Sequence, residues 1–214
     1  MEIKWLGHAC FQLKNKEASL VIDPYSEKIG LKLPKLKPDI VLISHHHFDH
    51  DDLSKIEGEP LIFDTPGEFE AKGFYIKGIG TFHDKEQGAS RGKNTMFLIK
   101  TEDINILHCG DLGHSLSPEI LEMLNDVDVL LIPVGGTYTI SGKEAAQIAR
   151  EIEPRMVVPM HYKVPGVNLD IAGAEEFIKE MGLSPSKENK ITLSSRSQLP
   201  EEETKLVLLE PASG

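Results

Sequence analysis

Residues 45–50, HHHFDH, combine four histidines and one aspartate within six positions. If the backbone stays extended past residue 44, His45 and His47 lie on one side of the chain and the middle histidine on the other. A turn into the next segment can then bring Asp49 and His50 to the same pocket. Imidazole nitrogens and carboxylate oxygens are ligands that Zn²⁺, Mn²⁺ and Fe²⁺ accept. The H-x-H-x-D-H spacing therefore predicts a metal site rather than a solvated loop.

The elements that position this cluster are predicted to be short strands at first, with helices in the second half of the chain. Apolar, β-branched runs indicate the strands. Ser117-Pro118 and the Ser141/Glu144 pair have the spacing of helix N-caps. We expect strands at 2–7, 10–14, 19–23, 39–44, 60–64, 67–72, 74–80, 94–100, 104–110, 127–133, 155–160, 190–195 and 205–210, and helices at 51–56, 117–125, 141–152 and 169–181. This order predicts one mixed α/β domain over residues 1–214.

The composition narrows the classes of protein. The chain has 214 residues, 40% hydrophobic and 27% charged residues, and a net charge of −11. Such an acidic chain without a basic stripe is not expected to bind nucleic acid. No signal peptide or membrane-length apolar run is recognisable. Two distant cysteines, Cys10 and Cys109, are typical of reduced thiols. We expect a cytoplasmic protein with a small-molecule substrate and no membrane partner. The sequence leaves open whether the chain forms a homo-oligomer.

Five stretches together resemble the metallo-β-lactamase fold superfamily of metal-dependent hydrolases, and they stand in that family's order over about residues 1 to 165. The stretches are WLGHACF (5–11), LVIDP (20–24), HHHFDH (45–50), HCGDLGH (108–114) and VVPMHY (157–162). LIPVGGTYT (131–139) resembles the branch that includes the L-ascorbate-6-phosphate lactonase-like proteins. The resemblance implies an α/β (α+β) fold, an αβ/βα sandwich of two central β-sheets flanked by helices.

The resemblance also implies a dinuclear centre with seven ligands. His45 and His47 would bind the first metal, Asp49, His50 and His161 the second, and Asp111 would bridge the two. Asp111 and His161 each follow an apolar strand-like run, and strand ends are where α/β folds place binding groups. The third ligand of the first metal is expected to be His83. His108 is the competitor, which we expect instead to donate a hydrogen bond to a ligand carboxylate or to a carbonyl.

Several other polar residues are candidates near this site. His8 orients a substrate or a ligand, or else lies on a surface turn. His114 is a candidate proton donor in catalysis, with a structural or exposed histidine as the alternative. Arg91 pairs with a substrate carboxylate or phosphate, or belongs to an ordinary hairpin turn, and Lys163 is a second anion-binding candidate. We expect PVGGTYT to bring backbone close to the pocket and Tyr138 to add a hydroxyl at its rim.

The function implied by the resemblance is a metal-dependent hydrolase. Two divalent ions, Zn²⁺ first with Mn²⁺ or Fe²⁺ as alternatives, would share a bridging hydroxide, because metals lower the pKa of bound water from 15.7 to about 7. Asp49 and Asp111 would hold the ions and orient the hydroxide. The expected substrate is a small ester, lactone or phosphate-bearing molecule. The alternatives are a mono-iron dioxygenase-type oxidoreductase on the same fold, or a small metal-dependent nuclease or phosphodiesterase.

Overall fold

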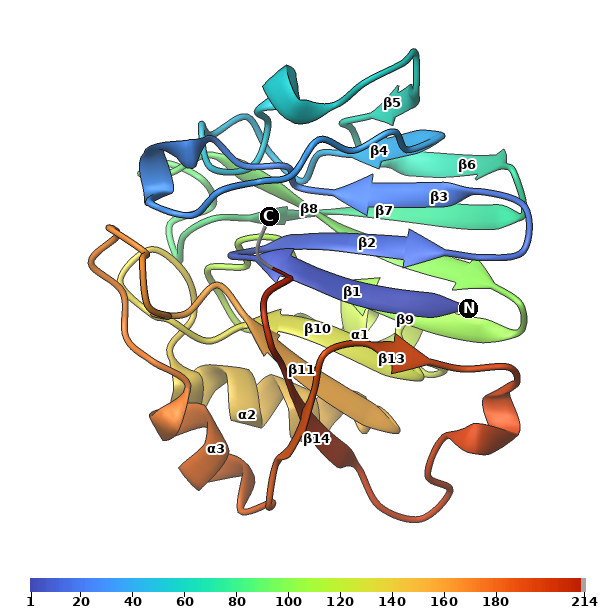
Figure 1. The fold of residues 1–214 in the computed structure, drawn as a ribbon. Coiled ribbons are helices and arrows are strands. Elements are labelled where there is room, and N and C mark those ends of the chain that lie inside the picture. The colour runs from blue at the N-terminus through green and yellow to red at the C-terminus, as the bar shows by residue number, and fades with distance from the viewer. Residues whose placement is uncertain (213–214) are drawn as a thin grey trace.

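Two β-sheets face each other across the hydrophobic core of the computed structural model, which describes residues 1–212 (Figure 1). The first sheet has six strands in the order β13-β1-β2-β3-β4-β5, and the second has eight in the order β12-β14-β11-β10-β9-β8-β7-β6. The first sheet consists of β1 (Glu2–Gly7), β2 (Cys10–Lys14), β3 (Ser19–Ile22), β4 (Ile40–Leu42), β5 (Leu61–Phe63) and β13 (Ile191–Thr192). The second consists of β6 (Gly67–Ala71), β7 (Phe74–Phe82), β8 (Lys93–Thr101), β9 (Ile104–His108), β10 (Val129–Pro133), β11 (Met156–Met160), β12 (Ser186–Glu188) and β14 (Lys205–Leu209).

Both sheets are mixed, and their parallel parts determine where loops converge. β3, β4 and β5 pair in parallel in the first sheet, as do β9, β10, β11 and β14 in the second. The carboxyl ends of parallel strands meet at one edge of a sheet. The loops after β4, β9 and β11 carry six of the seven expected ligands, and these loops meet at the same end of the sandwich.

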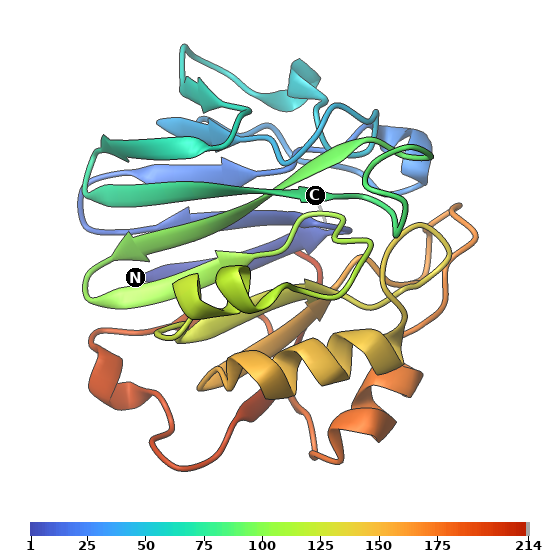
Figure 2. The same ribbon diagram turned by 180° about the vertical axis from the view of Figure 1, so that it is seen from behind.

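The helices lie outside the sheets (Figure 2). They are α1 (Pro118–Met123), α2 (Gly142–Ile152) and α3 (Glu175–Met181), with 3₁₀ turns at Glu27–Ile29, Leu53–Lys55 and Arg196–Gln198. Helix α2 begins with the predicted capping box, in which Ser141 and Glu144 bond each other's backbone N–H groups. Within residues 1–212 no helix is both long and apolar enough to cross a membrane.

Two helix predictions were wrong in extent. Residues 169–174 were expected to be helical, but Ala172 accepts a hydrogen bond from the Lys163 N–H and donates one to the Gly135 carbonyl. These bonds to other loops leave no partner for a helical turn, and α3 begins only at Glu175. The predicted helix over 51–56 is a single 3₁₀ turn with Asp52 as its N-cap.

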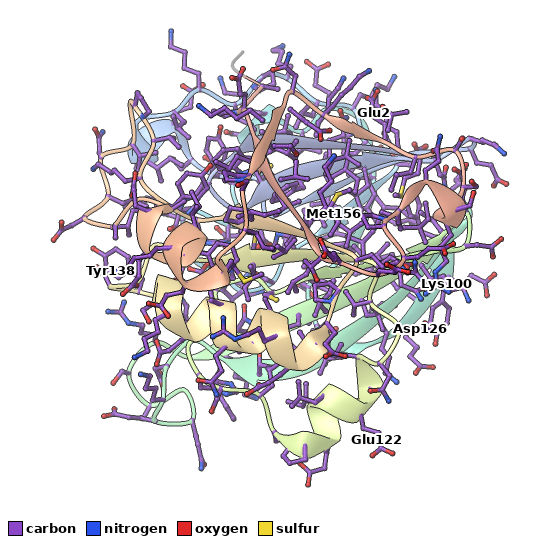
Figure 3. The ribbon with its side chains drawn as sticks, turned by 90° about the horizontal axis from the view of Figure 1, so that it is seen from below. Glu2, Lys100, Glu122, Asp126, Tyr138 and Met156 are labelled. Carbon is purple, nitrogen blue, oxygen red and sulfur yellow. The ribbon has the colours of Figure 1, made fainter. Side chains whose placement is uncertain are left out.

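The core forms between the sheets and beneath the helices. Its largest fully buried side chains include Trp5, Phe11, Phe97 and Phe177. In Figure 3 the labelled Tyr138 lies at one end of the sandwich, and Lys100 and Asp126 lie at the other. The α/β architecture with two central sheets and outer helices, predicted from the sequence, is confirmed.

Candidate metal centre

The seven expected ligands converge at one end of the sandwich from four segments. The ligand atoms fall into three groups, each within 4.8 Å: His45, His47 and His83; His8, Asp49, His50 and His161; and His45, His50 and Asp111. The first group holds the three histidines expected at the first metal, and the second holds the three residues expected at the second metal. The third group joins His45 and His50 through Asp111. The structure also brings His8 into the second group.

Asp111 is the common neighbour of these groups. Its Oδ2 lies 3.1 Å from Nε2 of His83, 3.2 Å from Nε2 of both His50 and His161, and 3.9 Å from Nε2 of His45. The side chain is almost fully buried. A single carboxylate oxygen thus faces histidines from both halves of the cluster.

A close approach of backbone to side chain fixes Asp111. Gly110, which follows β9 and Cys109, adopts φ +55°, and a Cβ at this position would lie 2.3 Å from Asn94 Oδ1. That oxygen accepts the Asp111 backbone N–H at 2.9 Å, and Asn94 Nδ2 donates to the Cys109 carbonyl at 2.9 Å. Sequence reasoning missed Asn94, because it precedes its partner by a whole hairpin.

Asp23 is a second residue that sequence reasoning missed. Directly after β3, its buried carboxylate accepts the backbone N–H and the hydroxyl of Ser44, both at 2.7 Å, and lies 3.0 Å from His50 Nδ1. The Ser44 hydroxyl in turn lies 2.9 Å from His45 Nδ1. These contacts engage the Nδ1 atoms of His50 and His45 and leave their Nε2 atoms for a ligand. The available signal was an aspartate that ends an apolar strand.

His8 closes the second group. It lies in the β1–β2 turn at φ +54°, and its carbonyl accepts the Trp5 indole N–H at 2.8 Å and the His161 N–H at 3.0 Å. Its Nε2 lies 3.1 Å from Asp49 Oδ2. Since His8 is fully buried, it lies on neither a surface turn nor an open substrate path. It orients Asp49 and holds the backbone of His161.

The structure places His83, and not His108, in the cluster. Both nitrogens of the buried His108 ring are engaged by backbone groups. Nε2 donates to the Ala9 carbonyl at 2.8 Å, and Nδ1 accepts the Gly110 N–H at 3.1 Å. His108 therefore donates to a carbonyl, one of the two kinds of acceptor expected for it, and has no nitrogen left for a metal.

Two predicted residues are not brought to the cluster. His114 Nε2 accepts the Phe82 N–H at 3.1 Å, and its Nδ1 lies 2.7 Å from the Ser115 carbonyl. With both ring nitrogens occupied, His114 has no free atom for the proton donation expected of it. Lys163 Nζ donates to the Leu169 carbonyl at 2.7 Å, within its own loop, and is in none of the ligand groups.

PVGGTYT does bring backbone close to the cluster. A Cβ on Gly135 would lie only 2.2 Å from the His161 carbonyl oxygen. Tyr138, further along this loop, lies beneath the Arg91 guanidinium, 4.9 Å from carbon to ring centroid. Arg91 and Tyr138 thus form one contact beside the cluster.

Unpaired buried atoms show that the cluster fits a metal. Among residues 1–212, seven buried side-chain nitrogens and oxygens have no hydrogen-bond partner, and they belong to His8, His45, His50, His83, Asp111 and His161. Buried polar groups are normally hydrogen-bonded. All seven exceptions fall in this cluster and are imidazole nitrogens or a carboxylate oxygen, which are donors suited to Zn²⁺ and similar ions.

The charges of the cluster also suit a cation. Burial lowers the pKa of His8 to about 4 and that of His45 to about 3, so both rings are neutral near pH 7, as metal ligation requires. Burial alone would lower the pKa of His50, but Asp111 and Asp23 raise it well above its usual range. Against burial, His161 and His50 hold the pKa of Asp111 well below its usual range. The centre thus retains ionised carboxylates.

Comparison with known proteins identifies the family of this chain. A family profile described as the β-lactamase superfamily domain matches residues 2–161. The chain belongs to this superfamily. It is 32% identical over 189 residues to a metal-dependent hydrolase of Pyrobaculum islandicum, covering 76% of this chain and 84% of the relative.

Solved structures share the fold. A candidate Zn-dependent hydrolase from Thermotoga maritima has 35% identity and a TM-score of 0.81, with 98% of each chain covered. A metallo hydrolase from Ignicoccus hospitalis, at 21% identity and a TM-score of 0.66 over 98% of this chain and 95% of that one, shows the same fold. The protein is a metal-dependent hydrolase with a metallo-β-lactamase fold.

Proposed function

We propose that this superfamily member hydrolyses a small ester, lactone or phosphate-bearing molecule at a dinuclear centre, with Zn²⁺ as the first candidate metal and Mn²⁺ or Fe²⁺ as alternatives. The observation that carries the proposal is the position of Asp111 Oδ2, within 3.2 Å of Nε2 of His83 on one side and of His50 and His161 on the other. One oxygen shared by two histidine groups is the arrangement that a bridging ligand needs.

The residues would hold the metals as two sets around this oxygen. His45, His47 and His83 would hold one ion, and Asp49, His50 and His161 the other. When bound, two divalent ions supply a shared water with a pKa of about 7 and a positive charge that polarises the target oxygen. Asp111 fixes the two sets relative to each other.

Asp49 has the second role in this proposal. Burial would raise its pKa, but the hydrogen bond from His8 lowers it well below the usual range. Asp49 therefore stays ionised and oriented by His8, as a carboxylate that binds a cation or accepts a hydrogen bond from the attacking water. His114 has no free nitrogen for leaving-group protonation, so we assign it no catalytic step.

The test combines metal analysis with a substrate screen. The chain is reconstituted with Zn²⁺, Mn²⁺ or Fe²⁺ and assayed against lactones, phosphodiesters and thioesters. Asp111→Asn should lose hydrolysis by at least about 100-fold and bind fewer than two ions. His46→Asn is the matched control, because the exposed His46 side chain is not in any of the ligand groups, and it should keep the metal content of the parent. Undiminished hydrolysis in Asp111→Asn, or one ion per chain in the parent, would contradict the proposal.

A further inference from the structure

A cavity of about 730 Å³ adjoins one side of the metal centre. Its walls come from the loop after β4, the segment between β5 and β6, the end of β7 and the start of β8. His45 and His47 line it, whereas Asp49, His50 and His161 do not. The volume is typical of a small-molecule site. A substrate whose reacting group lies at the metals can therefore extend into this cavity past His45 and His47.

Two cations line the cavity without a carboxylate partner. Within residues 1–212, the ion pairs closer than 4.0 Å include the neighbouring Lys85, which pairs with Glu144, but neither Arg91 nor Lys93. The cavity's one acidic side chain, Asp64, lies 3.6 Å from His46 Nε2. The half-buried Arg91 and the exposed Lys93 thus face a cavity that offers them no carboxylate within ion-pair distance. They share the lining with His45 and His47, so an anion bound by them would lie beside the metal centre.

The Arg91 guanidinium is held but not saturated. It lies over the Tyr138 ring at 4.9 Å, and Nη2 makes one long hydrogen bond of 3.4 Å to the Thr137 carbonyl. A guanidinium has five N–H donors. The contact with Tyr138 holds the guanidinium and leaves most of its donors free for a bidentate pair with a carboxylate or phosphate.

The backbone of Arg91 is fixed relative to the metal centre. Asp84 directly follows His83, and its carboxylate accepts four backbone N–H groups from the loop between β7 and β8. These belong to Glu86 (2.8 Å), Gly88 (2.8 Å), Ser90 (3.0 Å) and Arg91 (2.7 Å). A loop ordered before binding spares the entropy of ordering it on binding.

We propose that Arg91 and Lys93 bind an anionic group, a carboxylate or a phosphate, on the part of the substrate that does not react. This inference rests on the proposed function and narrows it to anionic substrates. Pro66 and Phe82, which also line the cavity, contact the apolar part between the anion and the reacting group.

The experiment compares two esters with one leaving group on the Zn²⁺-reconstituted chain. The neutral ester is 4-nitrophenyl acetate, and the anionic ester is mono-(4-nitrophenyl) glutarate. Removing a hydrogen bond to a charged group costs about tenfold to a hundredfold in binding, and the half-buried Arg91 is expected at the lower end of that range. Arg91→Gln should therefore lower the glutarate-to-acetate ratio of kcat/KM by about tenfold or more, and Arg91→Gln/Lys93→Gln by more than either single variant. Arg150→Gln and Lys187→Gln, two exposed cations far from the cavity, should leave the ratio unchanged.

A binding measurement separates this inference from the hydrolytic proposal. Calorimetry with glutarate, methyl phosphate and neutral glutaramide tests the metal-loaded chain even if neither ester is cleaved. Weaker binding of one anion in Arg91→Gln, with glutaramide unaffected, supports the inference and identifies carboxylate or phosphate as the group. If Arg91→Gln binds both anions as tightly as the parent and keeps the kinetic ratio, the inference is overturned, whatever the hydrolysis results.

Discussion

Asp23→Asn tests whether the hydrogen bonds of Asp23 to Ser44 and His50 stabilise the metal centre. The substitution keeps the shape but replaces Oδ2 by an NH₂ group. That group would face the Ser44 hydroxyl, now 2.7 Å from Oδ2, and His50 Nδ1, now 3.0 Å away. At His50 a donor then opposes a donor, whereas the Ser44 hydroxyl can rotate and accept a hydrogen bond from the NH₂ group. One buried hydrogen bond to a charged group is worth about 1.5–3 kcal/mol, so we expect a loss of that size in the unfolding free energy of the metal-free chain.

The same substitution should weaken metal binding about 10- to 100-fold, the usual effect of losing a partner behind a ligating histidine. Urea unfolding measures the first quantity, and competition with a chromogenic chelator measures the second. Asp39→Asn is the matched control, because its exposed carboxylate accepts one hydrogen bond, from the Ser19 N–H at 2.9 Å. Unchanged stability together with metal affinity within twofold of the parent would refute the role given to Asp23.

Three further outcomes are expected. The raised pKa keeps His50 protonated at pH 7 in the metal-free chain. Metal binding should therefore release about one proton, and metal affinity should rise with pH until His50 is neutral. Calorimetry in buffers of different ionisation enthalpy measures the number of protons released, and zero release would contradict the prediction. Gly135→Ala would place a Cβ 2.2 Å from the His161 carbonyl oxygen, so the Zn²⁺ content should fall towards one ion per chain, and two tightly held ions would show that the site tolerates the shift. Removing metal held at 100 times its Kd costs about 2.7 kcal/mol, so chelation should lower Tm by about 5–10 °C; an unchanged Tm would mean that the metals do not stabilise the fold.

Local spacing predicted those parts of the site that one short segment contains. The H-x-H-x-D-H pattern is such a segment, and Asp111 and His161 are marked by the apolar strands before them. Asp23 and Asn94 have no local mark, because their partners come from other strands of the fold. Their roles are products of tertiary packing.

Proximity in sequence was a poor guide to side-chain direction. Lys163 is two residues from His161, yet φ of +51° at His161 turns the chain, and the Lys163 backbone bonds to Ala172. His114 is three residues from Asp111 but faces the backbone of β7. The strands and the capped helix α2 were predictable from periodicity and capping, whereas the start of α3 depended on bonds to a distant loop.

The hydrogen bond from the His161 N–H to the His8 carbonyl joins the first turn of the chain to the strand that follows α2. A nascent polypeptide that ends before β11 lacks a ligand of the second metal position and cannot close this bond. Contacts of such large sequence separation form slowly, because the entropy cost of closing the loop comes before the stabilisation that the contact provides. In the proposed dinuclear centre, complete metal uptake would therefore be a late event in folding, and a bound pair of ions would indicate that both sheets have assembled.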